Sequence, residues 1–205
     1  MVFYQVLDHV FSTWSHIVVL RGLQDSAHGM TGREIARLSK MSHRSCLRAL
    51  TELEELAVII RYRGGRDHIF SLNREHVLVT QGILPALRLE REFLVGLNRV
   101  LSKLLGKWVE SMILFGSVAR KQETIGSDLD LCLVVTSKEM KEKVEELIYD
   151  AAPEISRQYG VNLAPLFLTV KEFSRKARLN QSPVNRILKE GIVITGKTLR
   201  ELSHG

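Results

Sequence analysis

The chain of 205 residues contains only two cysteines, Cys46 and Cys132, and they lie far apart. So few thiols exclude a disulfide framework and a zinc site built from several cysteines. No apolar run approaches the roughly 20 residues that a membrane-spanning helix needs. The first residues lack a basic leader ahead of their apolar stretch, so no secretion signal is expected. We therefore predict a cytoplasmic protein with no membrane partner, whose two thiols are free and buried.

The composition is that of a folded globular protein. Charged residues make up 25% of the chain and hydrophobic residues 45%, and no internal repeat or low-complexity tract is present. A disordered chain would have less apolar content. At roughly 150 residues per domain, this length corresponds to one or two domains.

Basic residues exceed acidic ones, with 29 Lys and Arg against 23 Asp and Glu, for a net charge of +6. Residues 33–66 hold eight basic and four acidic residues, and three of those acids lie within 52–55. The basic side chains can therefore form a face of their own, which favours a polyanionic partner.

The N-terminal part has a helical pattern. Apolar residues in steps of three and four predict one amphipathic helix over residues 4–23. Thr31 and Glu34 form a capping-box pattern that opens a short second helix. Ser42 is placed to cap a third helix. Its expected buried face has the spacing i, i+4, i+7 and i+11: Cys46, Leu50, Leu53 and Ala57.

After this helix, the period of the apolar pattern changes to two residues, which is typical of a strand. Residues 58–63 and 68–72 are predicted strands, and Gly64-Gly65 is the turn of a hairpin. Helix, helix, turn, helix and hairpin, in that order over residues 1–75, resemble a winged helix-turn-helix domain. The resemblance implies DNA binding, with the last helix in the major groove and the hairpin on the backbone. The residues that it implies for DNA contact are His43, Arg44, Arg48, Arg61, Arg63 and Arg66. A protein-binding module is the alternative.

Residues 76–107 are predicted to form one long bridging helix, with Pro85 in its first turn. A wide apolar stripe runs along it: Leu87, Leu94, Leu97, Leu101, Leu104 and Leu105. Because a large exposed stripe is unfavourable in a monomer, we predict a homodimer formed through this helix. The alternative is that the stripe packs against the chain's own two domains.

Strands and helices alternate in residues 108–205. We expect strands at 112–115, 129–135, 161–168 and 192–194, and helices at 137–158 and 170–178. A last helix is expected to begin at Pro183 and to end at Glu190. The predicted fold class is therefore α+β.

The motif that carries chemistry is Gly116-Ser117, followed after ten residues by Asp128-Leu129-Asp130. Glycine allows close approach of the backbone to a ligand, and N–H groups at a helix start bind anions together with the Ser117 hydroxyl. Two carboxylates on one face of a strand repel each other unless a cation joins them. Such oxygen ligands suit Mg²⁺ bridged to phosphates, as nucleotidyl transfer requires.

This pattern resembles the DNA polymerase β-like nucleotidyltransferase superfamily, and in particular its small, minimal members. The resemblance implies that Asp128 and Asp130 hold Mg²⁺ and that Gly116, Ser117 and Arg120 bind a nucleoside triphosphate, with ATP the expected one. Asp128, Asp130 and Ser117 are the implied catalytic residues. The implied reaction moves a nucleoside monophosphate to an acceptor hydroxyl, and a partner protein is one candidate acceptor.

One element of the superfamily pattern is missing. Active members supply a third carboxylate from the strand beside the Asp-x-Asp strand, and the predicted strand 161–168 holds no acid. Asn162 or Ala164 stands where that acid is expected, and Glu123 or an acid from a partner is an alternative source. Two hypotheses follow: a nucleotidyltransferase coupled to a DNA-binding domain, or a non-catalytic DNA-binding transcriptional regulator that senses a nucleotide or a partner protein.

Overall fold

The structure is a computed structural model that describes residues 4–204. The chain divides into an N-terminal unit, Met1–Phe93, and a C-terminal unit, Leu94–Gly205. Each unit combines helices with a small sheet, so the chain is α+β. Among the described residues, no helix is both long and apolar enough to cross a membrane.

The N-terminal unit contains helices and one small sheet. Its helices are α1 (Val6–Val10), α2 (Trp14–Leu23), α3 (Gly32–Leu38) and α4 (His43–Glu55). Its strands are β1 (Met30–Thr31), β2 (Ile59–Gly64) and β3 (Asp67–Leu72), all antiparallel in the order β1-β3-β2. A short π-helical segment, η1 (Val79–Ile83), leads into α5 (Leu84–Leu105), whose residues belong to both units.

The predicted helix starts in this unit are confirmed. The Thr31 hydroxyl accepts from the N–H of Glu34 at 3.2 Å, and the Glu34 carboxylate accepts from the N–H of Thr31 at 2.8 Å. The Ser42 hydroxyl accepts from the N–H of Ser45 at 3.1 Å. Each bond satisfies an N–H group that a helix start leaves without a partner. Ala57, expected on the buried face of the third helix, lies beyond its end and is exposed.

The prediction of a single helix over residues 4–23 is wrong. The chain forms α1 and α2 with a break between Val10 and Trp14. Thr13 is extended there, and its hydroxyl accepts from the N–H of His16 at 3.4 Å, which starts a new helix. The apolar spacing continues across the break, so periodicity alone did not show it.

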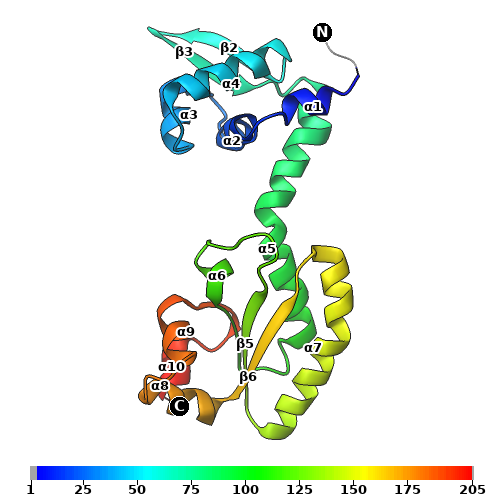
Figure 1. Cartoon of the computed structure of the whole chain (residues 1–205), viewed down its shortest axis with the longest axis vertical. Helices are drawn as coiled ribbons and strands as arrows, with labels where there is room; N and C mark the ends of the chain where they lie inside the picture. Colours follow the sequence, from blue (N-terminus) through cyan, green and yellow to red (C-terminus); the bar gives the residue numbers. More distant parts are fainter. Residues whose placement is uncertain (1–3, 205) are drawn as a thin grey trace. The chain divides into compact units, whose positions relative to one another are not determined.

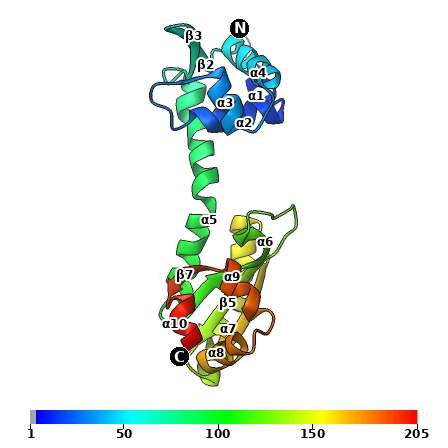
Figure 2. The same cartoon turned by 90° about the vertical axis from the view of Figure 1, so that its left-hand side faces the viewer.

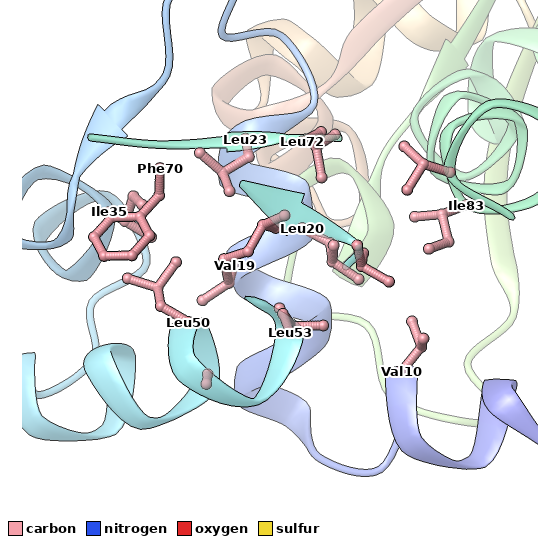
Figure 3. Close-up of a cluster of buried hydrophobic side chains, with 14 of the residues drawn as sticks. Val10, Val19, Leu20, Leu23, Ile35, Leu50, Leu53, Phe70, Leu72 and Ile83 are labelled. Atoms are coloured by element: carbon pink, nitrogen blue, oxygen red, sulfur yellow. The ribbon is translucent and has the colours of Figure 1, made fainter. Parts of the chain in front are cut away.

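One apolar core holds the N-terminal unit together (Figure 3). It draws side chains from α1 to α4, from the β2–β3 hairpin and from the start of α5. Fully buried members include Leu20, Leu50 and Leu53, and Phe70 of β3 closes the core at the sheet. This packing fixes α4 against α2 and beside the hairpin, which decides which α4 side chains face solvent.

The C-terminal unit is built on a four-stranded sheet. Its strands are β4 (Ser111–Leu114), β5 (Leu129–Val135), β6 (Leu163–Thr169) and β7 (Ile192–Gly196), in the order β6-β5-β4-β7. β5 and β6 are parallel and the other pairs are antiparallel. Its helices besides α5 are α6 (Gly116–Ala119), α7 (Lys138–Tyr159), α8 (Val170–Arg178), α9 (Val184–Glu190) and α10 (Leu199–His204).

Helices cover both faces of this sheet. The end of α5 and α7 pack on one face, and α8, α9 and α10 pack on the other (Figures 1 and 2). Side chains of β5 alternate between the two cores: Leu131 and Leu133 face α7, whereas Cys132 and Val134 face α8 and α9. The even-numbered residues of β5 therefore point to the side of the sheet that carries α9.

Helix α10 was not among the expected elements. The Thr198 hydroxyl accepts from the N–H of Glu201 at 3.3 Å, and the Glu201 carboxylate accepts from the N–H of Thr198 at 2.7 Å. Thr198 and Glu201 thus form the same capping box as Thr31 and Glu34, and this pattern in the sequence could have predicted the helix.

Both cysteines are free and buried, as predicted. Burial raises the pKa of the Cys46 thiol to about 11 and that of the Cys132 thiol to about 12. Because the thiolate is the nucleophile and the metal ligand, neither side chain is reactive at neutral pH.

The leucine stripe of α5 is covered within the chain. Leu87 lies in the core of the N-terminal unit, and Leu97, Leu101 and Leu105 lie in the core of the C-terminal unit. Leu94 and Leu104 pack against the latter core and are partly buried. The expectation that these leucines form an exposed interface is therefore wrong, because each unit uses its part of the helix. The homodimer remains a prediction, but these leucine side chains do not form its interface.

Candidate active site

The Gly-Ser turn lies directly against the Asp-x-Asp strand. The N–H of Phe115 donates to the carbonyl oxygen of Asp130 at 3.0 Å, just after β4 ends. Gly116 has a φ of +74°, and a Cβ at this position would lie 1.9 Å from the Asp130 Oδ2 atom. Only glycine fits both the conformation and the contact. The motif's two halves, separated by ten residues in sequence, form one site.

The two aspartates differ in exposure. Asp130 is half-buried on β5, and Asp128 is exposed just before that strand begins. Burial raises the pKa of Asp130 above its ordinary value, and the negative charge of Asp128 raises it further. Arg120 and Arg186 act in the opposite direction but do not cancel the shift. The pair is an unfavourable concentration of negative charge, which a bound cation would relieve.

Arg120, predicted to bind the nucleotide, is held at the edge of this site. Its Nη1 atom donates to a Glu190 carboxylate oxygen at 2.7 Å, and its Nε atom donates to the Gln122 side-chain oxygen at 3.1 Å. Glu190 lies at the end of α9, and its charge also raises the pKa of Asp130. Glu190 and Arg186 were not among the sequence-predicted residues, because nothing in the motif points to α9.

Ser117 follows Gly116 in α6, the short helix that contacts β5 and α9. Its carbonyl oxygen accepts from the N–H of Gln122 at 2.9 Å, and this bond begins the loop that leads to Asp128. Within residues 4–204, no side chain hydrogen-bonds to the Ser117 hydroxyl, so this group can bind a ligand. Glu123, the alternative acid suggested by the sequence, is exposed in the loop.

The position of the missing third carboxylate is now defined. β6 pairs with β5 in parallel, and Ala164 is the partner of Asp130 in the register. Leu166 and Leu168, two and four residues further along β6, pack in the same core as Cys132, so Ala164 shares the face of Asp130. Asn162 precedes β6, where its carbonyl oxygen accepts from the N–H of Leu129 at 2.8 Å. Of the two candidate positions, Ala164 is the one beside Asp130.

The donors present fit one magnesium ion that is shared with a substrate. Over residues 4–204, no group of three or more His, Cys, Asp or Glu side chains is arranged to hold a metal. Mg²⁺ usually keeps several waters and is bound through one or two carboxylates together with substrate phosphates. Asp128 and Asp130 provide those two carboxylates, and the Gly116 backbone packs directly against the Asp130 carboxylate.

The predicted DNA-contacting residues occupy the surface of the N-terminal unit. His43 of α4 and Arg61 of β2 line one groove, together with Leu47 and Thr51 of α4 and His68 of β3. Arg44 and Arg48 are exposed on α4, and Arg63 and Arg66 are exposed on the hairpin.

Carboxylates pair with only some of these arginines. Arg48 Nε donates to Glu52 at 2.7 Å, and Arg61 Nε donates to Glu54 at 3.0 Å. In the described part of the chain, Arg44, Arg63 and Arg66 form no ion pair. The structure thus brings His43 and Arg61 together in one groove and leaves the other four predicted residues exposed on α4 and the hairpin, in different charge environments.

Comparison with known proteins shows a similarity that covers most of the C-terminal unit. Residues 96–194 match a family model described as "Nucleotidyltransferase domain". This range contains Gly116, Ser117, Asp128 and Asp130, so the site described above lies within the part of the chain that is similar to this family. The match supports a nucleotidyltransferase-like function.

Solved structures resemble part of the chain. One, described as "Crystal structure of the toxin-antitoxin with AMP-PNP", is 14% identical over 52% of this chain and 81% of that one, with a TM-score of 0.35. Another, a crystal structure of a toxin-antitoxin MntA-HpeT mutant, is 12% identical over 52% and 80% of the two chains, with a TM-score of 0.33. No curated protein matches the chain.

Proposed function

We propose that the C-terminal unit binds a magnesium-bound nucleoside triphosphate, with ATP the expected nucleotide, and transfers its nucleoside monophosphate to an acceptor hydroxyl, with cleavage of the bond between the α- and β-phosphates and release of pyrophosphate. The observation that carries the proposal is the contact between Gly116 and Asp130, which joins the Gly-Ser turn to the carboxylate pair. A partner protein is a candidate source of the acceptor hydroxyl.

Each side chain has a role in this proposal. Asp128 and Asp130 hold Mg²⁺, which, when bound, neutralises phosphate charge. The Ser117 hydroxyl donates to a phosphate oxygen. Arg120, oriented by Glu190 and Gln122, pairs with another phosphate oxygen through the donors that those two residues leave unused.

The acceptor's proton has no obvious base. Because Ala164 stands beside Asp130, β6 supplies no third carboxylate to take that proton. The alternative function is therefore a regulator that binds the nucleotide, or a partner protein, without transferring anything. Transfer and nucleotide sensing need the same phosphate-binding residues, and a transfer assay distinguishes them.

Incubation of the protein with Mg²⁺, a cell extract and ATP labelled at the α-phosphate tests the proposal. We expect label on a macromolecule that depends on added protein, and no protein-dependent label when the ATP is labelled at the γ-phosphate, because nucleotidyl transfer retains only the α-phosphate. Chelation of Mg²⁺ and the Asp130→Asn variant serve as controls and should remove the signal. If the protein binds ATP but no label is transferred, the regulator is supported. If it binds no ATP, transfer and nucleotide sensing both fail, and a regulator that binds a partner protein is the version that remains.

We further propose that the N-terminal unit is a winged helix-turn-helix domain that binds DNA. The order of α2, α3 and α4 followed by the β2–β3 hairpin supports this, together with unpaired arginines on α4 and the hairpin. An exposed arginine without a carboxylate partner is available for a phosphate. The homodimer remains a prediction that this proposal does not require.

Replacement of Arg63 and Arg66 by alanine is expected to weaken binding to all DNA duplexes alike. Each phosphate contact that is lost should reduce the slope of log K against log salt by about 0.9. Fluorescence anisotropy over a salt series measures this slope. The matched control replaces two exposed arginines of α8, Arg175 and Arg178, and should leave the slope unchanged. A wild-type protein with no salt-dependent affinity for DNA would instead be a protein-binding module.

A further inference from the structure

We propose that Arg48 contacts the edge of a guanine base in the major groove, and that Glu52, anchored on the buried His16, is the positioning residue that orients it. This inference rests on the proposed DNA binding of the N-terminal unit. It adds to that function a sequence preference and the residues that produce it.

The observation is a chain of three side chains that joins α2 to the exposed face of α4. One Glu52 carboxylate oxygen accepts from Arg48 Nε at 2.7 Å, and the other accepts from His16 Nε2 at 2.8 Å. His16 is only 2% exposed, whereas Arg48 is 82% exposed. This series of hydrogen-bonded side chains therefore extends from the interior of the unit to its surface.

His16 is fixed from its other side as well. Its Nδ1 atom lies within hydrogen-bond distance of the carbonyl oxygens of His9, at 3.1 Å, and Val10, at 3.3 Å, and the Ser12 hydroxyl lies 3.3 Å from the same atom. Both ring nitrogens thus have partners, and burial prevents the ring from turning. A fixed ring fixes the Glu52 carboxylate, which in turn holds Arg48 at Nε.

Glu52 remains a charged anchor. The hydrogen bond from Arg48 holds the pKa of Glu52 below its ordinary value, and the bond from His16 acts in the same direction. The carboxylate is therefore ionised at neutral pH, and it orders Arg48 before any ligand arrives. Most exposed arginines lose side-chain entropy on binding, and an ordered one loses less.

The geometry favours a base over a phosphate for Arg48. With Nε occupied, the Nη1 and Nη2 atoms form the remaining donor edge, and this pair matches the O6 and N7 acceptors of guanine. The neighbouring carboxylate repels phosphate oxygens. Arg44, one turn earlier on α4, has no ion-pair partner in the described chain and is suited to a phosphate instead.

The experiment selects duplexes from a randomised library with the full-length protein and measures affinities for the selected sequence and its single-base variants. We expect wild type to prefer guanine at one position. Arg48→Ala should lose that preference, and Glu52→Gln should reduce it about tenfold, which corresponds to a typical bidentate base contact. Affinity for unrelated duplexes should stay equal or rise in Glu52→Gln, because a negative charge is removed.

Two further variants sharpen the test. Arg44→Ala should keep the guanine preference and lower the salt slope by about 0.9. Arg48→Lys keeps the charge but lacks the paired donors, so it should lose the preference and keep the salt slope. Because Arg48→Lys leaves the contact between Glu52 and His16 intact, it remains informative if Glu52→Gln fails to fold.

The outcomes separate this inference from the proposed function. Salt-dependent binding without any base preference, or a preference that Arg48→Lys and Glu52→Gln both retain, would overturn the role of Arg48 and leave DNA binding in place. If the wild-type protein binds no duplex, the DNA-binding function fails and this inference fails with it.

Discussion

Replacement of Asp128 and Asp130 together by asparagine is expected to abolish magnesium-dependent ATP binding while the C-terminal unit stays folded. Asparagine keeps the shape of each side chain but removes the negative charges that attract a divalent cation. Titration calorimetry with ATP, with and without Mg²⁺, measures the effect. An unchanged affinity for magnesium-bound ATP would show that these carboxylates do not hold the metal.

The same variant should melt at an equal or higher temperature than wild type in the absence of metal. Since burial and the charge of Asp128 raise the pKa of Asp130, its charged form is disfavoured in the folded state. The stability associated with this group is present below the ordinary pKa and is lost as the pH rises through the raised value. At neutral pH, removal of the charge therefore does not destabilise the fold. Asp150→Asn, an exposed aspartate on α7, is the matched control and should change neither binding nor melting.

Local patterns were sufficient to predict the parts of the site that lie on consecutive elements. The bounds of the predicted strand, 129–135, are those of β5 in the structure. They could be predicted because a polar loop precedes the apolar residues and Ser137, the N-cap of α7, follows them. Gly116 and Asp130 were predicted as one site from the motif, and the structure places them in contact.

Residues that reach the site from a distant element could not be predicted. Glu190 is 70 positions from Arg120, and only the packing of α9 on the sheet brings the two together. The choice between Asn162 and Ala164 depended on the strand register, because positions two residues apart share a face and only the pairing shows which of them lies beside Asp130.

The apolar stripe of α5 shows another property that could not be predicted from the sequence, namely which part of the protein covers it. A helix that serves the cores of two units has the same wide apolar pattern as one that forms a dimer. Leu87 and Leu101 are equally apolar in the sequence, but they lie in different cores. Hydrophobic periodicity shows which side chains are buried and does not show what covers them.

Ala164→Asp is expected to strengthen metal binding and to accelerate transfer of the α-labelled nucleotide. Adjacent strands lie about 4.8 Å apart, so the new carboxylate would stand beside Asp130 on the same face. It would add a third oxygen ligand and a base for the acceptor's proton. A rate increase of about tenfold corresponds to a barrier lower by about 1.4 kcal/mol, a modest share of what metal-assisted catalysis supplies.

Asn162→Asp is the comparison variant, because it adds the same charge two residues earlier, on the same face but away from the position that pairs with Asp130. Without metal, Ala164→Asp should melt at a lower temperature than wild type, since it adds a third negative charge to an already repulsive pair, and Mg²⁺ should reverse this loss. Equal effects of the two substitutions would contradict the register argument. If Ala164→Asp strengthens metal binding and leaves transfer absent, the missing carboxylate is not what limits the reaction, and the nucleotide-sensing regulator becomes the better description of this chain.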